Sequence, residues 1–216
     1  MNLFFTVSAL LLSLNIWAFD VQPVVLPQTE AEGSALIQEI MESSYVRTEN
    51  TFAFTTGDKS AQYPAGDFAI LWGLGENESD TNMAKDEYTR LWRIMGYLSA
   101  KGFRVIMNVR ADAGDVKEAV ETEGTSVVLY SGHGNTSGFY DFNKVRVGYD
   151  LFVNKAKSVY QFIVAVCYGR ESKANYNPPA DMMMFTWSGL TNSTDLENFV
   201  MGDWTGMEGK DLAVRK

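Results

Sequence analysis

The chain contains few of the residues that most often form disulfides and metal sites. Its 216 residues include one cysteine, Cys167, and one histidine, His133. A lone cysteine cannot form a disulfide within the chain, so it is an intermolecular bridge, a buried apolar residue or a free thiol kept for its reactivity. A zinc site would need carboxylates for its remaining ligands, and no ligand spacing supports one. We expect no metal and no cofactor.

Positive charge and long apolar runs are also scarce. Lys and Arg number 18 against 27 Asp and Glu, giving a net charge of −9. Binding to nucleic acid depends on clustered Lys and Arg, so we expect no nucleic-acid partner. Beyond the N-terminus no segment approaches the length of uncharged apolar residues that spans a membrane, so we expect no membrane association of the mature chain. Nothing resembles a P-loop or a dinucleotide-binding motif.

Three segments are predicted along the chain. Residues 1–18 have the short apolar centre and the small residue at the cut, Ala18, that are typical of a secretory signal peptide, so we expect a secreted or periplasmic protein. Residues 19–66 form a lead segment, which is either a propeptide or an edge strand and a helix. Residues 67–216 are long enough for one α/β domain.

From residue 67 apolar runs alternate with helical stretches, which predicts an α/β fold with a mostly parallel sheet. Asp112 is predicted to cap one helix, and Gly102 and Gly124 to close two. A further short helix is expected within residues 149–159. The strands are expected in five apolar runs, at residues 68–74, 103–109, 127–130, 161–166 and 182–187.

Two of these strands end at the unusual side chains. Residues 127–130 lead into Ser131-Gly132-His133-Gly134, and residues 161–166 lead into Cys167-Tyr168-Gly169. The carboxyl ends of parallel strands share one edge of the sheet, where ligands bind. If the two strands are neighbours, His133 and Cys167 lie about 5–10 Å apart, which suits nucleophilic catalysis by cysteine. Gly134 and Cys167 would then offer main-chain N–H groups to an oxyanion.

The stretches Tyr130-Ser131-Gly132-His133-Gly134 and Val164-Ala165-Val166-Cys167-Tyr168-Gly169 resemble those of the caspase-like cysteine peptidases, the superfamily of caspases, legumains, gingipains, clostripain and separase. The resemblance covers roughly residues 67–190. It implies a three-layer α/β/α sandwich of the caspase-haemoglobinase type and an endopeptidase that acts on peptide or protein substrates.

The resemblance also implies roles for individual residues. Cys167 would be the nucleophile, and His133 the general acid and base that protonates the leaving amine. Thr186, Trp187 and Ser188 would lie along the bound peptide, which adds as a strand to that edge. Two positions depart from the family pattern: Ala165 stands where a polar or acidic residue is common, and Tyr168 follows the cysteine. The residue preference at the scissile bond therefore stays open.

Three alternatives remain open at this stage. The chain could be a non-catalytic caspase-like module that binds a peptide or protein, or a structural protein in which Cys167 is part of the core. Acyl transfer such as transpeptidation would use the same Cys-His dyad. Residues 170–181 are interpreted as an exposed loop, with a mobile flap or a self-cleavage segment as further hypotheses. The oligomeric state is not predicted.

Overall fold

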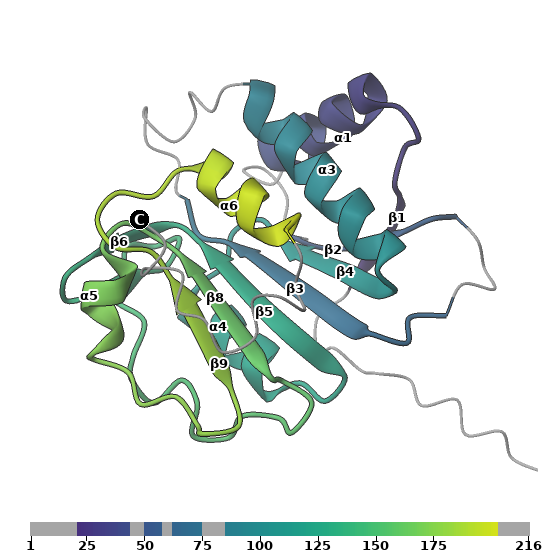
Figure 1. The fold of residues 1–216 in the computed structure, drawn as a ribbon. Helices are drawn as coiled ribbons and strands as arrows, with labels where there is room; N and C mark the ends of the chain where they lie inside the picture. Colours follow the sequence, from purple (N-terminus) through teal and green to yellow (C-terminus); the bar gives the residue numbers. More distant parts are fainter. Residues whose placement is uncertain (1–20, 44–49, 58–61, 75–84, 203–216) are drawn as a thin grey trace, which may run out of the picture.

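A computed structural model describes residues 21–43, 50–57, 62–74 and 85–202, and the predicted signal peptide lies outside these ranges. A seven-stranded sheet carries helices on both faces (Figure 1). The strands are β1 (Gln22–Val25), β2 (Thr51–Thr55), β3 (Gly66–Trp72), β4 (Phe103–Asn108), β5 (Thr125–Ser131), β8 (Gln161–Ala165) and β9 (Met183–Thr186). The helices are α1 (Glu30–Ser43), α3 (Lys85–Ala100), α4 (Ala113–Glu121), α5 (Gly169–Lys173) and α6 (Ser193–Val200). A separate hairpin is formed by β6 (His133–Asn135) and β7 (Gly138–Tyr140).

The sheet order is β1-β2-β4-β3-β5-β8-β9. The five strands from β4 to β9 are parallel, whereas β2 runs antiparallel to β4 and pairs in parallel with β1. The prediction of an α/β fold with a mostly parallel sheet is confirmed. The chain moves from β3 outward to β4 and then returns to place β5 on the other side of β3. This reversal between β3 and β5 creates a crevice at the carboxyl ends of the strands, where open α/β sheets bind ligands.

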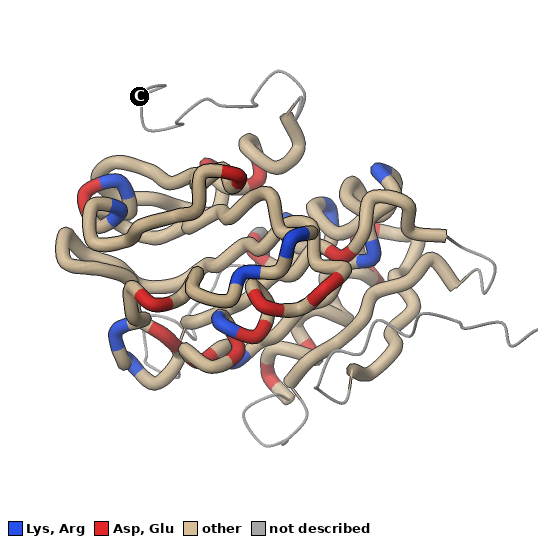
Figure 2. Tube along the Cα trace, turned by 90° about the horizontal axis from the view of Figure 1, so that it is seen from below, with Lys and Arg blue, Asp and Glu red and all other residues tan. Residues whose placement is uncertain are grey.

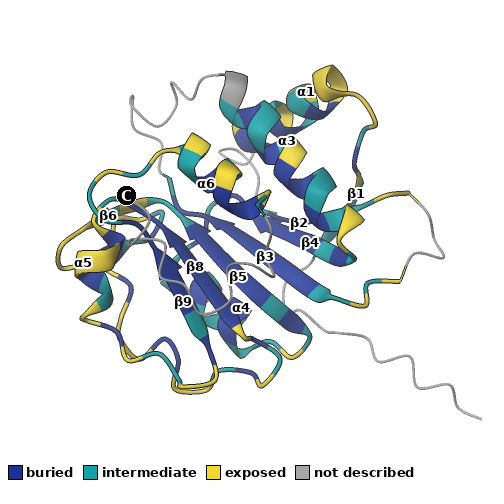
Figure 3. Ribbon diagram, viewed as in Figure 1, coloured by how far each residue is buried: buried dark blue, intermediate teal, exposed yellow. Residues whose placement is uncertain are grey.

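Two apolar cores hold the layers together, one on each face of the sheet. The helices α1, α3 and α6 cover one face, and α4 covers the other together with the turns between β7 and β8. Figure 3 shows the sheet buried along most of its length, with exposed residues on the outward sides of the helices. Central strands buried on both faces are near-continuous apolar runs in the sequence, which explains why they were predictable.

Local signals placed two of the three predicted helix ends as expected. The Asp112 carboxylate accepts hydrogen bonds from the main-chain N–H groups of Gly114 (2.7 Å) and Asp115 (3.0 Å). The Asp115 carboxylate in turn accepts the Asp112 N–H at 2.8 Å, which completes a capping box at the start of α4. Gly102, just after α3, and Gly124 have φ of 87° and 96°, the left-handed backbone that favours glycine. Gly124 does not close α4 as predicted, because that helix is capped by Thr122 in an extended conformation and Gly124 lies in the turn that follows.

The lead segment is built into the same sheet. β1 and β2 extend the sheet beyond β4, and α1 packs against α3. Ile37 and Ile40 of α1 are buried in the core on that face. Of the two alternatives for this segment, the edge strand and helix agree with these contacts.

The helix expected within residues 149–159 does not form, and turns take its place. The main-chain carbonyls of Ala156 and Val159 accept hydrogen bonds from the buried Lys155 ammonium, at 2.9 and 2.6 Å. The Ala156 N–H donates to the Val120 carbonyl of α4 at 2.9 Å. These bonds tie the segment to its neighbours in place of helical hydrogen bonds.

The interpretation of residues 170–181 as an exposed loop is also wrong in part. The segment begins within α5, and Ser172 and Tyr176 are buried. The Tyr176 ring stacks on Phe139 with centroids 5.3 Å apart, and its hydroxyl donates to the Val147 carbonyl at 3.1 Å. Residues 170–176 are therefore anchored to the core, which argues against a mobile flap there.

None of the described residues belongs to a helix long and apolar enough to cross a bilayer.

Candidate active site

Cys167 and His133 leave the sheet side by side. The strands β5 and β8 are adjacent and parallel, and Ser131 is the register partner of Ala165. His133 lies two positions after Ser131, and Cys167 lies two positions after Ala165. The Gly132 N–H donates to the Ala165 carbonyl at 3.3 Å, so the contact between the two chains continues past the strand ends. Parallel pairing thus brings to one edge two residues that are 34 positions apart in the sequence.

His133 lies at the start of the β6-β7 hairpin, which was not predicted. It is exposed and pairs with Tyr140 across the hairpin. The Asn135 side chain closes the turn, because its Oδ1 accepts hydrogen bonds from the N–H (2.8 Å) and hydroxyl (2.9 Å) of Ser137. Its Nδ2 donates to the Tyr140 hydroxyl at 3.0 Å. These bonds give the short hairpin a defined shape at the edge of the sheet.

The hairpin packs directly on the turn that carries the cysteine. A Cβ added to Gly134 would lie 2.6 Å from Cγ2 of Val166 and 2.7 Å from the Cys167 carbonyl oxygen. Distances below 3.0 Å essentially never occur for a real Cβ, so only glycine allows this approach. The main chain beside His133 is therefore in contact with the main chain of Cys167.

The residue after the cysteine has unusual backbone geometry. Tyr168 has φ of 57° and ψ of 28°, the left-handed region that a residue with a side chain seldom adopts. Gly169 follows and is packed against β9, since a Cβ there would lie 1.8 Å from Thr186 Oγ1. The chain turns directly after Cys167 and enters α5 at Gly169. Cys167 therefore lies at the carboxyl end of β8.

Cys167 and His133 line the same cavity, which has a volume of about 380 Å³. The cavity lies at the crevice between β3 and β5, with walls from the ends of β3, β5 and β8 and from α3 and α6. Its apolar lining comprises Trp72, Leu74, Leu91, Ile94, Ala165 and Leu196. Cys167 is half-buried and faces this space, so the hypothesis of a purely structural core cysteine does not fit its surroundings.

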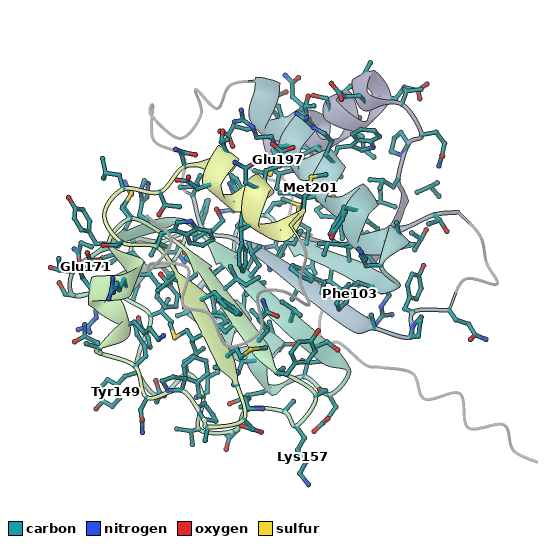
Figure 4. All side chains as sticks on the ribbon, viewed as in Figure 1. Phe103, Tyr149, Lys157, Glu171, Glu197 and Met201 are labelled. Carbon is teal, nitrogen blue, oxygen red and sulfur yellow. The ribbon has the colours of Figure 1, made fainter. Side chains whose placement is uncertain are left out.

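One wall of the cavity carries a network of charged residues. Arg90 of α3 donates to the Ser193 hydroxyl at 2.8 Å, and that hydroxyl donates to the Glu87 carboxylate. Arg90 also lies 3.6 Å from Glu87 and 3.2 Å from Glu197, which in turn pairs with Arg93 at 3.3 Å. Figure 4 labels Glu197 on α6, on the side of α3. The two negative charges of Glu87 and Glu197 are thus matched by the two positive charges of Arg90 and Arg93.

This wall depends in part on a helix after β9 that was not expected from the sequence. The helix α6 begins at Asn192, whose Oδ1 accepts the Asp195 N–H at 2.9 Å. The signal was present, since an Asn cap precedes the apolar positions Leu196, Phe199 and Val200 at helical spacing.

The predicted peptide-binding residues lie outside the described lining of the cavity. Thr186 and Trp187 are buried: the Thr186 hydroxyl donates to the Val164 carbonyl, and Trp187 packs edge-on against Phe199. The Ser188 hydroxyl donates to the Glu171 carboxylate at 2.9 Å, and hydrogen bonds from the Glu171 main chain and from Ser188 lower the pKa of this carboxyl. These three side chains are engaged within the fold.

The edge beyond β9 is also occupied in part. The Trp187 carbonyl accepts the Arg170 N–H at 2.8 Å, and the Met184 carbonyl accepts from the Lys173 ammonium at 3.3 Å. A peptide adding as a strand would need such carbonyls. These contacts give the predicted strand addition no support.

The two residues predicted to donate main-chain N–H groups to an oxyanion lie close together. Gly134 packs on the Cys167 carbonyl, and the Cys167 N–H has no acceptor among the residues that the structure describes. As far as the described residues go, this N–H group is therefore left for a substrate oxygen.

Among the described side chains, no three His, Cys, Asp or Glu residues gather as they would around a metal ion. Lys and Arg are interspersed with Asp and Glu along the described chain (Figure 2). No protein-family model matches this chain, and no curated protein matches it.

Proposed function

We propose that this protein is a secreted or periplasmic cysteine endopeptidase with a Cys167–His133 dyad. The observation that carries the proposal is that the sole thiol and the sole imidazole line one cavity at the ends of two adjacent parallel strands. The crevice between β3 and β5 is where this class of sheet binds its ligands. The proposal includes the caspase-like family, on the residues around His133 and Cys167, and it requires no cofactor.

The chemistry follows from the two side chains. His133 takes the proton of the Cys167 thiol. The resulting thiolate attacks the peptide carbonyl carbon and forms a carbon–sulfur bond, while the N–H groups of Cys167 and Gly134 stabilise the oxyanion. His133 gives a proton to the leaving nitrogen as the carbon–nitrogen bond breaks. His133 then takes a proton from water, which attacks the thioester and releases the acid and the thiol. An amine in place of water would give transpeptidation by the same steps.

Covalent labelling provides the test. The protein is incubated under reducing conditions with a set of peptidyl acyloxymethyl ketones, and the adduct is located by mass spectrometry. Because Cys167 is the only cysteine, any thiol adduct is assigned without ambiguity. We expect labelling of the wild type, loss of labelling in Cys167→Ala, and labelling slowed by about a hundredfold or more in His133→Ala.

Iodoacetamide is the matched control, since it reacts with an accessible thiol and needs no peptide-binding site. Modification of Cys167 by iodoacetamide, with no adduct from any peptidyl reagent, would contradict the peptidase and favour the non-catalytic binding module. In that module Cys167→Ser would also keep full biological activity.

A further inference from the structure

We infer that the cavity beside Cys167 selects an uncharged apolar side chain on the residue whose carbonyl is attacked. This inference rests on the proposed function and names the substrate class of the same site. The attacked carbonyl is one carbon from its side chain, so that side chain enters the space next to the sulfur. Cys167 lines the cavity of about 380 Å³, which is therefore the space that this side chain would enter.

The apolar part of the lining comes from three directions. Trp72 ends β3, Leu91 and Ile94 project from α3, and Leu196 projects from α6. All four side chains are at least 95% buried in the fold. A charged side chain that lies against the small surface they expose to the cavity would lose hydration there and gain no partner from these neighbours. An aliphatic or aromatic side chain would instead remove its own apolar surface from water.

The charged wall does not offer a binding partner for a substrate charge. Its cation, Arg90, is flanked by Glu87 and Glu197, and the hydroxyl of Ser193 bridges Arg90 and Glu87. A substrate carboxylate would compete with Glu87 and Glu197 for Arg90. A substrate ammonium that approached either acid would be repelled by the positive charge of Arg90 beside it. Among the described residues, no charge on this wall is left without a partner of the opposite sign, so neither a substrate carboxylate nor a substrate ammonium finds one there.

The position two residues before the cysteine agrees with this arrangement. Ala165 lines the cavity and is buried, so a methyl group stands at the floor of the site. A polar or acidic residue there would have given a direct partner for a charged or amide side chain.

The test uses peptidyl acyloxymethyl ketones that differ only in the side chain next to the reactive carbonyl. Norleucine is compared with lysine, and leucine with aspartate, because each pair has a similar shape and differs in charge. We expect Cys167 to be labelled at least about tenfold faster by the apolar member of each pair. In parallel, Cys167→Ala is tested for binding of the corresponding fluorescent peptides, a readout that needs no chemistry.

Two variants shift the preference in opposite directions. Glu87→Gln keeps an acceptor for Ser193 and leaves Arg90 with one acid, so labelling by the aspartate reagent rises relative to leucine. Arg90→Gln leaves Glu87 without its cation, so labelling by the lysine reagent rises relative to norleucine. Lys117→Gln is the control, since Lys117 pairs with Asp150, neither residue lines the cavity, and the variant leaves both ratios unchanged.

Each outcome separates the two proposals. Equal or faster labelling by lysine or aspartate reagents overturns the inference, while the adduct on Cys167 still supports the peptidase. No adduct with any reagent, together with tighter binding of apolar peptides to Cys167→Ala, overturns the peptidase and supports the apolar preference. If no reagent forms an adduct and no peptide binds, both the peptidase and the apolar preference are overturned.

Discussion

The Tyr130 hydroxyl donates a hydrogen bond to the main-chain carbonyl of Tyr140. Tyr140 is the residue that pairs with His133 across the β6-β7 hairpin, so this bond connects the buried end of β5 to the strand beside His133. Burial raises the pKa of Tyr130, and the nearby Asp141 carboxylate adds to this effect, so the hydroxyl stays protonated as a donor. Gly73 and Gly132 leave room for it, because a Cβ at either would lie within 3.0 Å of its oxygen.

Tyr130→Phe should loosen the hairpin. The substitution leaves a partly buried carbonyl without its donor, and we expect the free energy of unfolding to fall by about 1–2 kcal/mol, measured by urea denaturation. Labelling by a peptidyl reagent should slow by about tenfold, since small displacements of a catalytic group are costly. Tyr176→Phe is the control, because its buried hydroxyl also donates to a main-chain carbonyl, that of Val147, and it should lose similar stability without slowing the labelling. Equal effects of both substitutions on the labelling would show that the bond does not position His133.

Gly134→Ala should displace the hairpin from the cysteine turn. Its Cβ would meet Val166 and the main-chain carbonyl of Cys167, which cannot move aside without shifting the site. We expect peptidyl labelling of Cys167 to fall by about a hundredfold or more. Gly138→Ala lies in the same hairpin and is the matched control, since its Cβ meets the flexible Arg146 side chain, with Nε at 2.7 Å. Unchanged labelling in Gly134→Ala would contradict the close contact.

Tyr168 should respond to backbone conformation more than to side-chain size. Tyr168→Gly relieves the left-handed strain at φ 57°, so we expect its free energy of unfolding to stay within about 1 kcal/mol of the wild type. Tyr168→Val places a β-branched residue there and should be less stable than Tyr168→Gly by about 1–2 kcal/mol. Lys144→Gly, at the other described non-glycine residue with positive φ, serves as the control and should also stay within about 1 kcal/mol of the wild type. A Val variant as stable as the Gly variant would show that strain at Tyr168 is absent.

Asp115 should make the stability of the protein depend on pH. Burial raises its pKa from 3.8 to about 6, although the hydrogen bond from the Asp112 N–H acts in the opposite direction. The folded state therefore binds more protons than the unfolded state between these values, so the free energy of unfolding falls as the pH rises from 3.8 to about 6. Asp115→Asn keeps an acceptor for Asp112 and removes the ionisation. We expect the variant to gain stability over the wild type between about pH 4 and pH 7, measured by urea unfolding at both. A difference that does not change with pH would contradict the raised pKa.

Much of the sheet follows from local patterns. The five apolar runs correspond to the five parallel strands. A strand covered on both faces is apolar at nearly every position, so it stands out in the sequence. Asp112, Gly102 and Gly124 marked turns and helix ends, since capping and left-handed backbone depend on the residue itself. The same local signals at Asn192 would have located α6.

The elements that were not predicted correctly depend on contacts with residues far away in the sequence. Residues 149–159 form turns because their main chain is hydrogen-bonded to the Lys155 side chain and to α4. Such contacts cannot be predicted from local helix propensity. The β6-β7 hairpin is short and polar, so it lacks the apolar alternation that reveals a strand. Its packing on Cys167 follows from the fold around Gly134.

The sequence by itself determined that one thiol and one imidazole each follow a buried strand, because apolar runs and glycines are local features of the chain. Only the tertiary structure decided that these strands are neighbours in register at the reversal between β3 and β5. Strand order depends on how the crossovers pack against the two faces, and that packing involves residues far apart in the chain. The balanced wall of Glu87, Arg90 and Glu197 arises in the same way, from two helices that meet only once the sheet has formed.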